Sequence, residues 1–143
     1  MSFPPPPPCR TKPHAPPTPA LADAQFDAVR ATVLDDNPGM EPELAARIVT
    51  EALKFVATAA RGADDMTPSR LVDKGWHALI LHTALYKQLC AHLGGFVDHY
   101  PSPQGTEGDL DAFDRTIRSI ERAGFAVDRQ LWDERTSVLA GER

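Results

Sequence analysis

The chain has 143 residues, 42% of them hydrophobic, which suits one domain with a single core. Its 15 Lys and Arg against 20 Asp and Glu give a formal net charge of −5, and the basic residues are scattered, so nucleic-acid binding is not expected. No apolar run approaches the ~20 residues of a membrane span. The amino terminus shows no signal-peptide pattern and two cysteines make no disulfide framework, so we expect a cytoplasmic protein with reduced thiols and no membrane contact.

Proline dominates the first 20 residues, which hold nine of the 14 prolines. Because proline fixes φ and lacks a backbone N–H, no helix or central strand is expected there. Residues 1–18 are predicted to be a disordered leader, either a stiff tail or a polyproline II ligand for an aromatic groove on a protein partner. The single domain is expected to span residues 19–135, and residues 136–143 to form a flexible tail.

Two helices are predicted to follow the leader. The first begins after a Thr18 N-cap and a proline, and it stops near Asp35 at an Asn-Pro-Gly breaker. The second runs from Glu41 to a C-cap at Gly62, with a wide apolar stripe at period 3.6. The charged residues of the second helix are expected to form a solvated face: Glu41, Glu43, Arg47, Glu51 and Lys54.

The stretch from Val72 to Pro101 holds the most apolar run and four of the five histidines. A Thr67 N-cap followed by proline begins a helix that is apolar over most of its circumference, which is typical of a helix inside a bundle. Asp73 and His77 lie one turn apart on its polar strip. We expect Asp73 to accept a hydrogen bond from the His77 ring, while Trp76 packs in the core.

A fourth helix is predicted from Ala84 to Leu93, after an N-cap at Thr83 and before a glycine pair. Tyr86 and Cys90 lie one turn apart on it and share a face. The segment that follows is expected to be extended, because a proline at position 101 disfavours helix at the residue before it. This segment presents His99 from a loop, and its Phe96 is expected to pack in the core.

A fifth helix is predicted from Leu110 to Ala123, ending at Gly124, and Asp128 caps a short terminal turn that contains Leu131 and Trp132. The sequence shows no internal repeat and no strand alternation. It therefore predicts an all-α fold, a compact bundle of about five helices with a disordered proline-rich N-terminal tail.

Three hypotheses compete for the histidine-rich stretch. In the first, Asp73, His77, Tyr86, Cys90 and His99 form a ligand-binding cluster, and His77, Cys90 and His99 bind zinc or another transition-metal ion, which imidazole and thiolate suit. In the second, Cys90 is a nucleophile activated by a histidine that Asp73 orients. In the third, Asp73 and His77 are a structural pair.

A family resemblance rests on the pattern D-x-x-W-H, here Asp73, Trp76 and His77, followed by Tyr86, Cys90, Gly95 and the segment from His99 to Pro101. Over roughly Glu41 to Trp132 the chain resembles the glycine-rich domain-containing protein-like family. The resemblance implies a compact helical bundle and no defined activity. The pattern does not require His82 or His92.

The sequence therefore predicts a small accessory or binding protein that holds a metal ion or small ligand at the His/Asp/Cys cluster and acts with a protein partner. One alternative is an adaptor with a structural His/Asp pair, and the other is an enzyme with a Cys/His site. The sequence does not fix the oligomeric state.

Overall fold

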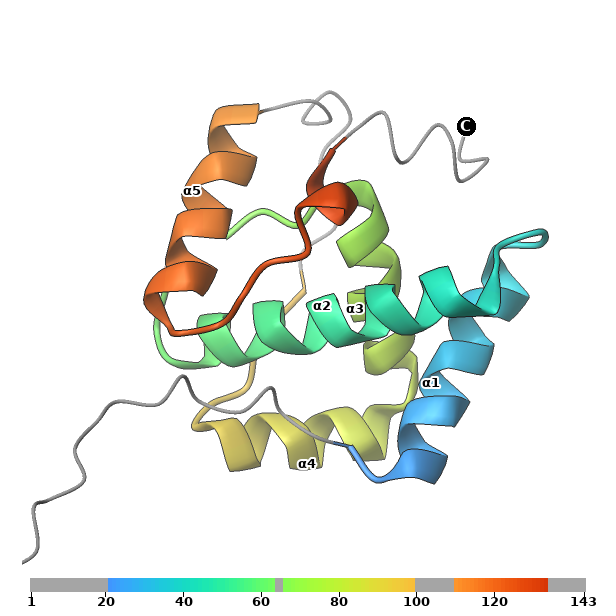
Figure 1. The fold of residues 1–143 in the computed structure, drawn as a ribbon. Coiled ribbons are helices and arrows are strands. Elements are labelled where there is room, and N and C mark those ends of the chain that lie inside the picture. The colour runs from blue at the N-terminus through green and yellow to red at the C-terminus, as the bar shows by residue number, and fades with distance from the viewer. Residues whose placement is uncertain (1–20, 64–65, 100–109, 134–143) are drawn as a thin grey trace, which may run out of the picture.

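The computed structural model describes residues 21–63, 66–99 and 110–133. These residues form five α-helices and one short 3-10 helix, without a strand among them, which confirms the all-α prediction (Figure 1). The proposed leader (residues 1–18), the Thr18 cap and the C-terminal tail (residues 136–143) lie outside the described residues.

Helices α1 (Asp23–Asp36) and α2 (Pro42–Ala60) end where the sequence signals predict. After α1 the Asn37 side chain donates to the Val33 carbonyl at 2.7 Å, and Gly39 adopts a φ of 91° that other residues avoid. Pro42 is the first residue of α2, where its missing N–H leaves no bond unmade. The breaker between the two helices therefore acts as a tight, hydrogen-bonded turn.

Helix α3 (Arg70–Leu81) begins later than predicted, because its N-cap is Ser69 and not Thr67. The Ser69 hydroxyl accepts a hydrogen bond from the Val72 N–H at 3.2 Å and donates to the Leu131 carbonyl at 2.7 Å. The Thr67 N–H instead donates to the Thr116 hydroxyl. One buried serine thus caps α3 and fastens the C-terminal segment to it.

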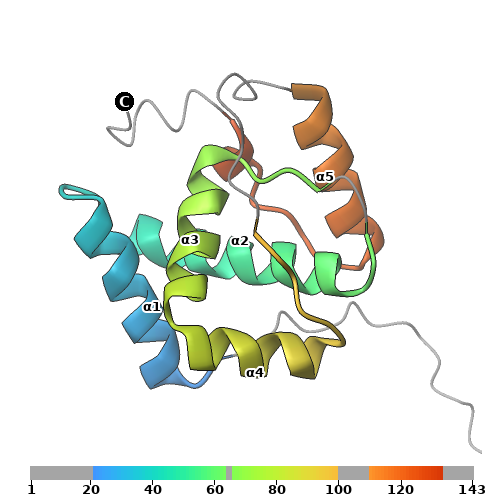
Figure 2. The same cartoon turned by 180° about the vertical axis from the view of Figure 1, so that it is seen from behind.

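Helices α2 and α3 cross at the centre of the molecule, and α1 and α4 (Thr83–Leu93) pack beside them (Figures 1 and 2). Gly75 lies at this crossing. A Cβ atom there would stand 2.7 Å from the Ile48 carbonyl oxygen and 2.9 Å from the Ala52 Cβ. The absence of a side chain at Gly75 is what lets the two helices approach so closely.

Helix α5 (Leu110–Arg122) and the 3-10 helix η1 (Arg129–Trp132) cover the end of the bundle away from α1 and α4 (Figure 1). Phe113, Ile117 and Ile120 of α5 are buried, and the Phe113 and Trp132 rings meet edge to face with centroids 6.1 Å apart. The predicted fifth helix and terminal turn are confirmed. Asp128 precedes the turn, although its side chain makes no cap hydrogen bond.

The prediction that Glu51 belongs to a solvated face is wrong, because Glu51 is 0% exposed. Its carboxylate accepts hydrogen bonds, each of 3.1 Å, from the Lys54 ammonium, the Asp128 backbone N–H and the Trp132 indole N–H. Beside it, Arg47 binds Asp128 through two hydrogen bonds of 2.8 and 2.9 Å, which raise the pKa of the guanidinium. The segment around η1 therefore covers the charged face of α2.

Phe96 is also misplaced by the sequence prediction, since it is 62% exposed and not part of the core. It lies in the extended segment after α4, and its ring meets the buried Tyr86 ring edge to face at 5.4 Å.

None of the helices in the described ranges combines the length and the apolar character that are needed to cross a membrane.

Candidate functional site

The D-x-x-W-H residues lie on helix α3, partly in the core and partly at the surface. Trp76 is 6% exposed, and its ring packs against the Phe55 ring of α2 with centroids 4.8 Å apart. Asp73 is half-buried, and His77 is exposed. Residues three and four apart lie near one another on a helix, so Trp76 faces inward while Asp73 and His77 flank it on the outer side.

A chain of hydrogen bonds starts at Trp76 and reaches the segment after α4. The Trp76 indole N–H donates to the Tyr86 hydroxyl at 2.9 Å, and the Tyr86 hydroxyl donates to the Val97 carbonyl at 2.5 Å. Buried polar groups of tryptophan and tyrosine need such partners. This chain fixes the extended segment against α3 and α4.

The same segment brings His99 onto α3. The His99 Nε2–H group donates to the Asp73 Oδ1 atom at 2.8 Å, and the His99 ring meets the Trp76 ring edge to face at 4.4 Å. The side chain of His99 is 17% exposed and that of Asp73 is 45% exposed. Asp73 therefore pairs with His99 and not with His77, which corrects the predicted partner.

Burial changes the acid–base behaviour of Tyr86. Removal from water raises the pKa of the phenol well above its ordinary value of 10, the hydrogen bond from Trp76 opposes this, and the nearby Cys90 adds to it. The phenol therefore stays protonated at neutral pH. It can serve as the hydrogen-bond donor that holds Val97.

Cys90 lies next to Tyr86 in the core and is 0% exposed. In a protein whose Cys9 is replaced by serine, we expect Cys90 to react with iodoacetamide at neutral pH far more slowly than a free thiol, because the reagent must wait for the core to open. Mass spectrometry of timed samples measures the rate. Rapid labelling of the folded protein would support the hypothesis that Cys90 is a nucleophile. In urea, where the chain is unfolded, Cys90 should react as fast as a free thiol, which controls for the integrity of the thiol.

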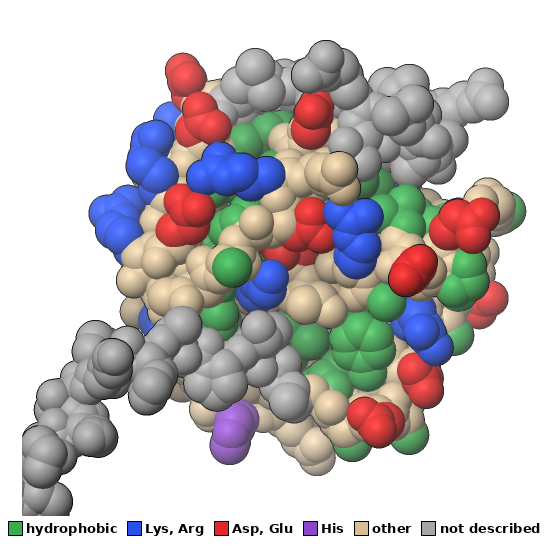
Figure 3. Space-filling view, viewed as in Figure 1, with side chains coloured by type: hydrophobic (Ala, Val, Ile, Leu, Met, Phe, Trp, Pro, Cys, Tyr) green, Lys and Arg blue, Asp and Glu red, His purple; other side chains and the backbone are tan. Residues whose placement is uncertain are grey.

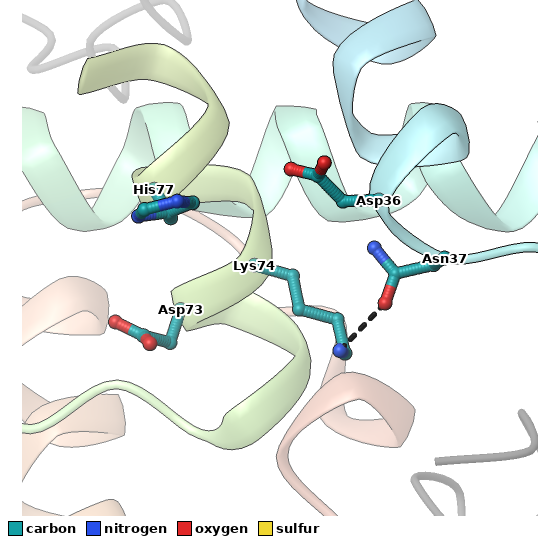
Figure 4. A pocket seen from close by; sticks show the side chains of 5 residues that line it. All are labelled: Asp36, Asn37, Asp73, Lys74 and His77. Atoms are coloured by element: carbon teal, nitrogen blue, oxygen red, sulfur yellow. Dashed lines mark hydrogen bonds between the residues drawn. The ribbon is translucent and has the colours of Figure 1, made fainter. Parts of the chain in front are cut away.

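A polar depression of about 420 Å³ lies where the end of α1 meets the outer side of α3. Five residues line it: Asp36, Asn37, Asp73, Lys74 and His77. Asp73 and His77 project from one side of α3, while the Lys74 ammonium donates to the Asn37 amide oxygen at 2.6 Å (Figure 4). The depression thus joins two of the predicted site residues to three residues that the sequence did not indicate.

The other two histidines of the stretch lie apart from this site. His82 Nε2 is 2.8 Å from the Thr32 hydroxyl of α1, and His92 is exposed near the end of α4. The hydrogen bond of His82 links the α3–α4 junction to α1.

The five predicted ligand-binding residues therefore form a connected series rather than one pocket. Asp73 and His77 face the depression, His99 holds Asp73 from the side, and Tyr86 and Cys90 lie deeper in the core. Within the described residues, which include His77, Cys90 and His99, no group of three or more His, Cys, Asp or Glu side chains is arranged to hold a metal ion. The geometry thus gives the metal hypothesis no support.

Asp36, Asn37 and Lys74 are the site residues that the sequence prediction missed. Asn37 belongs to the predicted Asn-Pro-Gly breaker, and Asp36 lies directly before it. Their role depends on where the end of α1 lies relative to α3, a long-range contact that local sequence does not reveal. The nearest available signal was the pair of polar residues directly before a proline.

Comparison with known proteins corrects the family assignment. No curated protein and no solved structure matches the chain. The family model that does match is described as UCP032817-like and covers residues 20–120, which include α1 to α4 and most of α5. The predicted resemblance to the glycine-rich domain-containing protein-like family is therefore wrong, and the chain belongs to the UCP032817-like family.

Proposed function

We propose that this domain is a small-ligand-binding protein whose ligand occupies the polar depression between α1 and α3. One observation carries the proposal: Asp73 lines the depression and is at the same time held by His99. A carboxylate that is oriented before the ligand arrives loses less conformational entropy on binding than a free one. The Trp76 and Tyr86 contacts extend this support into the core.

The charges of the depression indicate the kind of ligand. Asp36 and Asp73 contribute two carboxylates, and the one ammonium present, Lys74, is already hydrogen-bonded to Asn37. His77 adds a ring nitrogen that can donate or accept a hydrogen bond. This set favours a small organic cation with an amine or guanidinium group, which pairs with carboxylates through charge-assisted hydrogen bonds.

The volume of about 420 Å³ lies within the range of small-molecule sites, but the depression is open to solvent. A bound ligand would keep much of its hydration, so we expect a dissociation constant on the order of 0.1 mM.

The proposal predicts that Asp73→Asn weakens the binding of agmatine, which carries one amine and one guanidinium, by about tenfold, since a hydrogen bond to a charged group contributes roughly 1.5 kcal/mol or more. Asp36→Asn should have a similar but smaller effect. The measurement is a two-dimensional NMR titration of the labelled protein.

Matched controls separate the site from general charge effects. Asp35→Asn removes the same charge one residue before Asp36, on an exposed position that does not line the depression, and should leave the titration unchanged. His77→Ala removes a residue that lines the depression and should also weaken agmatine binding. His92→Ala is its control, because both histidines are exposed on helices. Equal weakening by Asp35→Asn and Asp73→Asn, or no shifts around α3, would refute the proposal.

The metal hypothesis stays a separate prediction with its own test. Elemental analysis of protein purified without a metal-affinity tag should detect stoichiometric zinc or another transition metal if His77, Cys90 and His99 bind one. Such a result would require these residues to rearrange, because the structure does not group them for a metal.

A protein partner and a cytoplasmic location complete the proposal. The free thiol of Cys90 suits a reducing compartment, and cell fractionation tests the location. Capture of partners from a lysate by the full chain, compared with a chain lacking residues 1–17, tests whether the proline-rich segment recruits one.

A further inference from the structure

The outward face of α5 carries a stripe of arginines. Arg115, Arg118 and Arg122 are all exposed and follow one another at spacings of three and four residues, so they lie in one row along the helix. Phe113, Ile117 and Ile120 on the opposite face anchor α5 to the core. The row is therefore held on a fixed helix and not on a mobile loop.

The arginine stripe is short of partners within the molecule. Arg115 and Arg118 make no ion pair in the part of the chain that the structure describes, and the Arg122 Nε–H group donates only to the Arg118 carbonyl, at 3.5 Å. Helix α5 also carries three exposed acids. Glu121 accepts a hydrogen bond from Arg129 at 3.1 Å, whereas Asp111 and Asp114, four residues before Arg115 and Arg118, make no ion pair with them among the described residues. Guanidinium donors are thus left facing solvent in a chain whose formal net charge is −5.

The surface around the arginine stripe is hollowed and carries further charged residues. Arg118, Glu121 and Arg122 line a shallow hollow of about 510 Å³. At the end of the stripe Arg61, the residue that follows α2, donates to the Ala123 carbonyl and lies over the Phe125 ring, 5.7 Å from its centroid. Over α5, basic side chains alternate with acidic ones (Figure 3).

We propose that the arginine stripe is a docking surface for an acidic segment of a partner protein. The row runs over eight residues, from Arg115 to Arg122, or about 10 Å along the helix axis, which about three residues of an extended peptide would match. In an extended run of Asp and Glu, alternate side chains share a face about 6.6 Å apart, so those on one face can reach successive guanidinium groups, which bind carboxylates through paired hydrogen bonds. A long polyanion such as nucleic acid would extend beyond the stripe and meet the excess negative charge of the chain.

The test uses the full chain and fluorescein-labelled octaglutamate as the probe, followed by fluorescence anisotropy in 50 mM salt. We expect saturable binding that weakens as salt rises, at least tenfold loss of affinity in the triple variant Arg115→Gln, Arg118→Gln, Arg122→Gln, and a smaller loss in Arg118→Gln alone. Lys87→Gln removes one charge from an exposed position on α4 and should bind as the wild type does. Circular dichroism of each variant confirms the fold.

Two results would overturn the proposal. One is that octaglutamate does not bind at all, or that Arg118→Gln and Lys87→Gln, both folded, change its affinity by the same factor. The other is tighter binding of a 30-nucleotide single-stranded DNA than of octaglutamate, with loss of that binding in the arginine variants, which would assign the arginine stripe to nucleic acid.

Discussion

Replacement of Trp76 by alanine is expected to lower the free energy of unfolding by about 3 to 5 kcal/mol, the usual range for truncating a large buried aromatic side chain. Trp76 is 6% exposed and packs against Phe55 and His99. The truncation also removes the indole N–H that donates to Tyr86. Such a loss is a large fraction of the roughly 5 to 15 kcal/mol that stabilises a native domain, so the variant should unfold at a much lower urea concentration.

Urea denaturation followed by circular dichroism measures this effect. Trp76→Phe keeps much of the ring packing but lacks the N–H donor, so it should fall between the wild type and Trp76→Ala. His77→Ala, the next residue on the same helix, is exposed and should change the unfolding free energy by less than about 0.5 kcal/mol. A Trp76→Ala protein within 1 kcal/mol of the wild type would contradict the central position given to this ring.

Replacement of Glu51 by alanine is expected to cost about 3 to 5 kcal/mol, because it leaves a buried cation and two further donors without their acceptor. The Lys54 side chain is only 13% exposed and retains one hydrogen bond, to the Ala126 carbonyl. The Asp128 and Trp132 N–H groups lose the bonds that hold η1 against α2. Unsatisfied buried donors are more costly than the net value of the bonds themselves.

Thermal or urea unfolding measures the loss, and hydrogen exchange tests its location. Relative to the wild type, Glu51→Ala should increase the exchange rate of amides around η1 more than that of amides in α1, since the broken bonds lie at the C-terminal segment. Glu51→Gln keeps an acceptor oxygen and should be less damaging. Glu43→Ala removes an exposed acid from the same helix and serves as the control; a Glu51→Ala protein as stable as that control would refute the buried role.

The helices were predictable because their limits are written in local sequence. Pro42 at the start of α2 and the glycines after α2, α4 and α5 act through φ alone, which needs no knowledge of the rest of the fold. Thr67 shows the limit of this approach. Thr67 and the proline after it form a typical start of a helix, yet Ser69 is the N-cap of α3. The Ser69 hydroxyl also donates to the carbonyl of Leu131, a residue far along the chain.

The candidate site was predicted less completely, for the same reason. Helical spacing placed Asp73 and His77 on one face correctly, but the choice of His99 as the partner of Asp73 depends on how the segment after α4 returns. Glu51 fits a charged helix face by periodicity, and the distant Asp128 and Trp132 make it a buried acceptor. Local patterns thus predict which residues share a face, whereas long-range packing decides what covers that face.

The hydrogen bond from Tyr86 to Val97 has a consequence for how this domain can vary. Its acceptor is a main-chain oxygen, which every amino acid supplies, so the bond survives exchange of the side chain at position 97. The exposed neighbour Asp98 makes no part of this hydrogen bond, whereas Phe96 adds a ring contact to Tyr86. Position 97 can therefore change and still let the segment deliver a histidine to the same aspartate, whereas loss of the phenol removes the donor.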